Sequence, residues 1–376
     1  DVPGVAASSQ SIGNYIAYLR GDTSKETANG GAYRTRKFRL GDIVDAKPVI
    51  VGPPNSGFYD TYNAGYAAFR TQYASRRNVV YVGANDGMLH AFDGTAGNTS
   101  PLSGSELFAY IPSFVYGSAS TAATTGLASL GNPSFTHHYL VDATPGAFDI
   151  DLSRTSGGAG APKWRTLLIG GLGKGGKGYY ALDVTDPTSW TDEASIASKV
   201  MWEFTDSRMG YSYGTPTVAK TKKYGWVVIF TSGYTNADGR GYFFIVNPSS
   251  GALLEAVATP AGAGSASAPL NMGQATAYIE NYADMTADAV YAGDLQGNVW
   301  RLDVSASDIT RPYPTPTKIA RLTDGRGNAQ PITTRPLVEV APNSSTRYLL
   351  VGTGKLLADS DIASGAQQSF YAIVDG

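Results

Sequence analysis

The residue types that most often carry out chemistry in proteins are scarce in this chain. Its 376 residues include three histidines and no cysteine, which excludes thiol catalysis, thiolate zinc sites and disulfide bonds. His137 and His138 are neighbours, and neighbouring side chains of a strand point to opposite faces, so they are poorly placed to share one metal. His90 lies inside an apolar segment, where we expect a packed core residue. The histidines therefore define no catalytic or metal-binding group.

One glycine-rich segment superficially matches a phosphate-binding loop. Residues 171–178 read Gly-Leu-Gly-Lys-Gly-Gly-Lys-Gly. A phosphate loop needs Ser or Thr after its lysine, to hold magnesium, and a helix directly afterwards. Here Gly178 follows the lysine, and residues 179–183 have the pattern of a strand. We therefore interpret the segment as a hairpin turn and not as a nucleotide site.

Another segment has residue types and a spacing that suggest binding to a receptor. Arg20, Gly21 and Asp22 form a tripeptide of the kind that integrin-type receptors bind. It follows residues 12–19, whose apolar spacing predicts a short amphipathic helix. Two interpretations stay open: a turn that ends this helix, and a receptor-binding site formed by Arg20, Gly21 and Asp22.

The composition indicates which elements must position these residues. Glycine (45), tyrosine (24) and proline (20) are abundant, charged residues make up 16% and hydrophobic residues 42%. That apolar fraction supports a large core and argues against disorder. The net charge of −2 gives no basic field for nucleic acid, and no apolar run approaches the roughly 20 residues of a membrane helix. A turn-rich β protein is expected.

The domain organisation is expected to be simple. Length alone would allow two domains, but single β domains often exceed about 250 residues, and no long low-complexity linker divides the chain. We predict one domain over residues 1–376, in which residues 1–40 form a lead-in that contains the short helix. Because the chain opens on Asp1 without a signal-like segment, we expect it to be the C-terminal fragment of a longer protein.

Internal repeats indicate the architecture. Each repeat has an apolar strand, a Gly-rich turn and a second strand that ends in Asp or Asn. A further strand precedes each hairpin, usually with a proline at its start, where no ladder hydrogen bond is lost. The five recognisable hairpins lie at residues 79–93, 166–183, 226–247, 289–303 and 348–375. The strands before them lie at residues 47–51, 144–148, 215–218, 274–279 and 335–338.

Three folds use such units: a propeller, a membrane barrel and a sandwich. Segments such as residues 226–230 and 166–169 are apolar at successive positions. The strands of a membrane barrel instead alternate between lipid-facing and lumen-facing residues. Strands that are apolar on both faces need another layer on each side, as stacked blades provide. We therefore predict an all-β propeller, with five blades recognisable from the sequence.

Seven segments carry motifs that occur in one known family. In chain order they are residues 40–45, 79–93, 138–142, 209–216, 289–303, 328–333 and 351–354. Together they resemble the C-terminal domain of the PilC/PilY family of type IV pilus biogenesis factors and tip-associated adhesins. The resemblance implies a modified, seven-bladed β-propeller. It also implies an extracellular location, at the pilus tip or outer-membrane surface, and roles in surface adhesion, twitching motility and antagonism of pilus retraction.

The family resemblance also implies a candidate metal site. Members can carry a nine-residue calcium loop, Asp-x-Asp-x-Asp-x-x-x-Asp, whose register here falls on residues 280–288. Calcium takes six to eight oxygen ligands, but Tyr282 stands at the third position, so the loop is degenerate. The alternative is an acidic turn between two strands. The implied ligands are Glu280, Asp284, Thr286 (through its backbone carbonyl) and Asp288.

The function implied by the resemblance is non-enzymatic. Its partners would be minor pilins or other type IV pilus components and a host-cell or abiotic surface, with calcium as a cofactor of the loop. Two alternatives stay open. Propellers also form quinone-dependent dehydrogenases, although those that oxidise alcohols often have adjacent cysteines, and this chain has none. The second alternative is a docking scaffold for minor pilins that touches no host surface.

Overall fold

The computed structural model describes residues 1–95, 103–118, 121, 124–155, 158–281, 283–341 and 346–375. These residues form short helices and many strands, and they separate into two compact units. The first unit comprises residues 1–51, 77–145 and 171–177, and the second comprises residues 52–76, 146–170 and 178–376. The single domain expected from the sequence stays a prediction.

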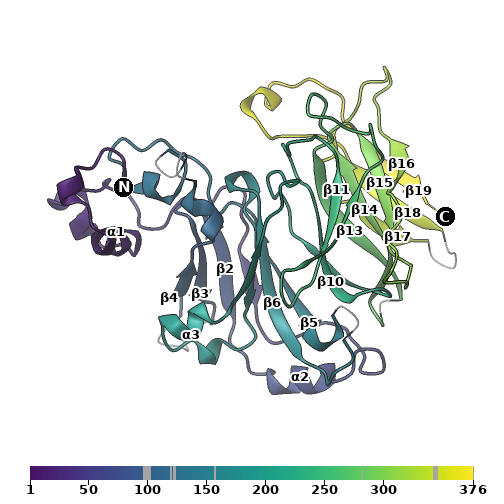
Figure 1. The fold of residues 1–376 in the computed structure, drawn as a ribbon, viewed down its shortest axis with the longest axis horizontal. Helices are drawn as coiled ribbons and strands as arrows, with labels where there is room; N and C mark the ends of the chain where they lie inside the picture. Colours follow the sequence, from purple (N-terminus) through teal and green to yellow (C-terminus); the bar gives the residue numbers. More distant parts are fainter. Residues whose placement is uncertain are drawn as a thin grey trace. The chain divides into compact units, whose positions relative to one another are not determined.

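The first unit contains one four-stranded sheet (Figure 1). It is an antiparallel meander in the order β1-β2-β3-β4. Gly87 closes the turn between β2 and β3 at φ +89°, a conformation that strains any residue with a side chain. The strands are β1 (Val49–Val51), β2 (Val79–Ala84), β3 (Met88–Asp93) and β4 (Glu106–Tyr110).

The lead-in over residues 1–40 contains helix α1 (Ile12–Leu19). The helix begins where the Ser11 hydroxyl accepts a hydrogen bond from the Asn14 amide at 3.1 Å. It buries Tyr18, whose ring packs against Tyr33 at a centroid distance of 5.2 Å. The helix predicted over residues 12–19 is therefore confirmed with the same bounds.

The second unit contains the remaining meanders (Figure 1). One parallel bridge, between Lys220 and Thr286, joins two of them into an eight-stranded sheet. Helices α2 (Tyr66–Gln72) and α3 (Glu193–Ala197) lie in connections between strands. No helix in the described part of the chain is long and apolar enough to span a membrane. The strands are β5 (Gly146–Asp151), β6 (Trp164–Gly171), β7 (Tyr179–Asp183), β8 (Val200–Phe204), β9 (Thr217–Thr221), β10 (Gly225–Thr231), β11 (Tyr242–Val246), β12 (Leu253–Ala258), β13 (Met272–Asn281), β14 (Thr286–Asp294), β15 (Asn298–Asp303), β16 (Thr317–Arg321), β17 (Leu337–Val340), β18 (Arg347–Gly352) and β19 (Phe370–Val374).

All five predicted hairpins are present, as β2–β3, β6–β7, β10–β11, β14–β15 and β18–β19. The strands predicted before them are β1, β5, β9, β13 and β17. Four of the meanders gain a fourth strand, namely β4, β8, β12 and β16, whereas β17–β19 is three-stranded among the described residues. The seven blades that the resemblance implies stay a prediction.

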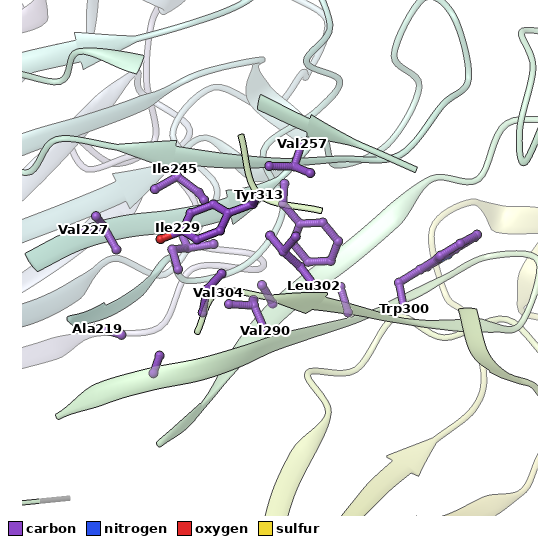
Figure 2. Close-up of a cluster of buried hydrophobic side chains, with 14 of the residues drawn as sticks. Ala219, Val227, Ile229, Ile245, Val257, Val290, Trp300, Leu302, Val304 and Tyr313 are labelled. Carbon is purple, nitrogen blue, oxygen red and sulfur yellow. The ribbon is translucent and has the colours of Figure 1, made fainter. Parts of the chain in front are cut away.

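Strand β10 shows how the second unit is built. Val227 and Ile229 pack into one apolar cluster with side chains of β14 and β15, whereas Val228 and Phe230 pack into another with side chains of β6 and β7. Figure 2 shows the first cluster, in which Ile229 lies near Val290. Successive residues of one strand are thus buried on opposite faces. This confirms the predicted burial on both faces, which stacked blades require.

Candidate functional site

The segment predicted as a calcium loop, residues 280–288, comprises the end of β13, the turn that follows and the start of β14. The Asn281 side chain accepts a hydrogen bond from the Ala283 amide at 3.0 Å, and its carbonyl accepts from the Asp284 and Met285 amides at 3.1 and 3.0 Å. Met285 takes a positive φ of 64°. The turn is therefore held by its own backbone and side-chain hydrogen bonds.

The four implied calcium ligands do not form an oxygen cage in this conformation. Asp284 Oδ1 accepts a hydrogen bond from the Thr286 amide at 2.7 Å, and Asp288 Oδ1 lies 3.4 Å from the Lys222 ammonium. Glu280 is exposed near the end of β13, and Tyr282 lies outside the described residues. Among the residues that the structure describes, no three His, Cys, Asp or Glu side chains are arranged to hold a metal. Calcium binding stays a prediction.

The Arg20-Gly21-Asp22 tripeptide ends helix α1. The Arg20 amide donates to the Ile16 carbonyl at 2.9 Å, and Gly21 follows at φ +93°. Asp22 Oδ1 then accepts from the Ser24 amide at 2.9 Å, and hydrogen bonds from the Ser24 side chain and from this amide lower the pKa of Asp22. The predicted helix-ending turn is confirmed. Its Arg20 is exposed and its Asp22 side chain is 40% exposed, so a receptor could reach both charges.

The glycine-rich segment at residues 171–178 is a turn, as predicted. Gly173–Gly175 form one turn of 3-10 helix, and β7 follows without any helix. A Cβ atom on Gly175 would lie 1.9 Å from the Leu140 carbonyl oxygen. The glycine there is required for close packing and not for phosphate binding.

The first unit contains a buried histidine held between two carboxylates. His90, on β3, has its Nδ1 2.5 Å from Glu106 Oε1 and its Nε2 3.1 Å from both Asp86 oxygens. Burial by itself would lower the pKa of His90, but the hydrogen bonds to Asp86 and Glu106 outweigh it and raise the pKa to about 9. The expected packed core histidine is therefore also a buried cation.

The same turn between β2 and β3 holds the segment that starts at residue 40. Asp86 Oδ2 accepts from the Gly41 amide at 2.7 Å, and Asn85 Nδ2 donates to Asp42 Oδ2 at 2.8 Å. His137 Nε2 lies 2.9 Å from the same Asp42 oxygen. His138 instead contacts Ser129 Oγ at 2.9 Å, so the neighbouring histidines serve different partners, as their spacing predicts.

A second buried carboxylate lies in the first unit. Asp142 is 1% exposed, and one of its oxygens accepts from the Asp45 amide at 3.2 Å. Its other oxygen has no hydrogen-bond partner among the described residues. Burial raises the pKa of Asp142 to about 7, and the nearby Asp45 charge acts in the same direction. The sequence signal was an Asp that directly follows an apolar run, and sequence reasoning did not use it as a site.

Comparison with known proteins shows the family to which the chain belongs. Residues 40–376 match the family described as the PilY1 beta-propeller domain. The chain belongs to the PilY1 family. Similar PilY1 relatives include a type IV pilus biogenesis factor PilY1 homolog of Xylella fastidiosa, 33% identical over 99% of this chain, and the type IV pilus biogenesis factor PilY1 of Pseudomonas aeruginosa (strain PAK), 33% identical over 96% of it.

A solved structure supports the same assignment at the level of the fold. The crystal structure of the Pseudomonas aeruginosa PilY1 C-terminal domain matches with a TM-score of 0.66 and 29% identity, over 87% of this chain and 64% of that chain. The PilY1 family and the β-propeller class expected from the sequence are thus confirmed. The chain spans only 28% of the Xylella relative and 30% of the Pseudomonas PilY1.

Proposed function

We propose that this chain is a non-enzymatic PilY1-type module that supports type IV pilus biogenesis. The observation that carries the proposal is the family match over residues 40–376, with relatives named type IV pilus biogenesis factors. Those names describe biogenesis factors and not enzymes, which favours this function over a quinone-dependent dehydrogenase. They also support type IV pilus components as partners and a cell-surface or pilus location.

In its finer form, the proposal is that the module promotes surface adhesion and twitching motility by antagonising pilus retraction, from the pilus tip or the outer-membrane surface. Minor pilins are the partners we propose within the pilus. Tyr59 and Tyr62, which are 66% and 53% exposed in one loop, support a contact surface. Tyrosine contributes a large amphipathic contact area at low entropic cost.

A chimera tests this function. In a bacterium that lacks its own PilY1, the full-length protein is restored with its C-terminal domain exchanged for this chain. We expect surface pili and a twitching zone to return. If the module antagonises retraction, a strain that also lacks the retraction motor should be piliated with or without the chimera. The proposal is contradicted if the chimera reaches the surface at a normal level but restores no pili in the strain that keeps its retraction motor.

The receptor role of Arg20-Gly21-Asp22 has its own test within the chimera. Asp22→Glu keeps the charge but moves the carboxylate by one methylene, so host-cell binding should fall if a receptor reads this tripeptide. Asp308→Glu, at an exposed aspartate of the second unit, is the matched control. Full host-cell binding by the Asp22→Glu chimera would remove the receptor role.

A further inference from the structure

The second unit contains a pocket with a positively charged lining. Its volume is about 450 Å³, within the range of small-ligand sites. One wall is the loop that precedes α2, another is the turn after β5, and the third is the β9–β10 hairpin. The lining residues that matter here are Tyr62, Arg154, Trp164, Lys220, Lys222 and Trp226.

Two of the pocket's cations form no close ion pair among the described residues, although the charges of Asp284 and Asp151 attract Lys220 from a greater distance. Lys220 is half-buried on β9, and its ammonium contacts the Tyr62 carbonyl at 3.4 Å and lies 5.8 Å from the Trp226 ring centroid. Arg154 is exposed at the pocket mouth. Within the described ranges, no carboxylate oxygen lies within 4.0 Å of the charged nitrogens of either residue. Burying part of a lysine without an anion is unfavourable, so the pocket favours a ligand that supplies one.

The acidic residue that lines the pocket, Asp151, attracts Lys220 through its charge but forms no close ion pair with it, because its carboxylate is held by other donors. Asp151 is 3% exposed, and its Oδ1 accepts hydrogen bonds from the Ser153 amide, the Ser153 hydroxyl and the Lys163 amide at 2.7 to 3.0 Å. Lys222 forms an ion pair with Asp288 at 3.4 Å. Because the Lys222 side chain is 53% exposed, this ion pair contributes little to stability. Because the whole chain carries a net charge of −2, this local excess of positive charge does not reflect a basic protein.

We propose that this pocket binds carboxylate side chains of an acidic peptide segment on a protein partner. The Arg154 guanidinium matches a carboxylate with two parallel donors, and the Lys220 ammonium adds a second charge deeper in the pocket. The indole rings of Trp164 and Trp226 are 4% and 2% exposed, so they offer no open face on which a sugar ring could stack. A flexible acidic peptide therefore fits the lining better than an acidic sugar does.

The proposal can be tested on the purified whole chain by measuring the binding of labelled hexaglutamate through its fluorescence anisotropy. This test does not depend on the proposed pilus function. We expect saturable binding at about 50 mM salt that weakens at about 300 mM salt, and no binding of hexaglutamine. The R154Q/K220M variant should lose at least about tenfold in affinity, since two charge-assisted hydrogen bonds are removed. K318M, at an exposed lysine on β16, should stay within about twofold of the wild type.

Two further measurements keep the proposal falsifiable. R154E changes an exposed side chain and should leave the melting temperature unchanged, so it separates loss of binding from loss of folding. Equal hexaglutamate affinity of wild type, R154E and R154Q/K220M overturns the site, as does a complete lack of binding to the wild type. Oligogalacturonate that binds more tightly than hexaglutamate, with the same dependence on Arg154 and Lys220, overturns the peptide ligand in favour of an acidic sugar.

Discussion

At the scale of single residues, His90 is a buried cation held by Asp86 and Glu106. Its pKa is raised to about 9, above the unfolded value of about 6.5. The interaction therefore stabilises the fold fully below about pH 6.5, and this stabilisation is lost as the pH rises through about 9. We expect His90→Gln to lower the free energy of unfolding by about 2 kcal/mol near pH 6 and by much less near pH 10, measured by urea denaturation.

The control for His90 is His137→Gln. The His137 side chain is 46% exposed beside Asp42, whose side chain is 49% exposed, and exposed ion pairs contribute about 0–1 kcal/mol. We expect a small effect of this variant at both pH values. If His90→Gln cost the same free energy near pH 6 and near pH 10, the ring would act through packing and not through its charge.

Asp142 should likewise make the fold less stable as the pH rises, but over a lower pH range and through an unfavourable charge. Burial raises its pKa to about 7, above the unfolded value of about 3.9. The fold therefore loses stability as the pH rises from about 4 to about 7, because the buried carboxyl must ionise. We expect Asp142→Asn to raise the melting temperature relative to wild type at about pH 8 and to leave it nearly unchanged at about pH 4. Calorimetry that shows a lower melting temperature for the variant at both pH values would contradict this.

At the scale of elements, strand β10 offers a test of whether both faces of its sheet contribute buried side chains to stability. Ile229 and Phe230 are neighbours that pack into different clusters and are 0% and 2% exposed. We expect Ile229→Ala and Phe230→Ala to lower the free energy of unfolding by about 2–5 and about 3–5 kcal/mol. Leu337→Ala, at a side chain 54% exposed, should cost less than about 1 kcal/mol. If only one of the two neighbours mattered in denaturant titrations, burial on both faces would be wrong.

The β13–β14 connection is the element on which a calcium response depends. To bind calcium, Asp284 and Asp288 must turn away from the Thr286 amide and from Lys222. If calcium raises the melting temperature of the wild type, Asp284→Ala and Asp288→Ala should each abolish the rise, whereas Glu339→Ala, at an exposed carboxylate on β17, should not. Calorimetry of the wild type that shows neither heat nor a melting shift in millimolar calcium removes the site.

At the scale of the whole molecule, the two units are interleaved along the chain. The second unit takes residues 52–76 and 146–170 from between segments of the first. A fragment of residues 178–376 lacks β5 and β6, which contribute Ile150, Trp164 and Leu167 to a core cluster. We expect this fragment to melt without a cooperative transition and to bind the dye ANS. The full chain should melt cooperatively and should not bind ANS. A cooperative transition of the isolated fragment would contradict this expectation.

The hairpins and helix α1 could be predicted because their signals are local. Alternating or continuous apolar residues around a Gly-rich turn define a hairpin such as β2–β3, and a glycine such as Gly87 supplies the positive φ that its turn needs. The Asp42 contacts with Asn85 and His137 could not be predicted in this way. They join residues that are far apart in sequence, and nothing in their spacing indicates which loops meet.

The sequence by itself therefore determined the repeated hairpins, the helix before Arg20 and membership of the PilY1 family, since each depends on residues that are neighbours in the chain or on their order along it. Only the tertiary structure decided which charges are buried and which are paired. His90 became a cation between two carboxylates, whereas Lys220 lies half-buried in a pocket where no described carboxylate forms a close ion pair with it. Burial and pairing depend on the side chains that the fold packs around a group, and these come from distant parts of the sequence.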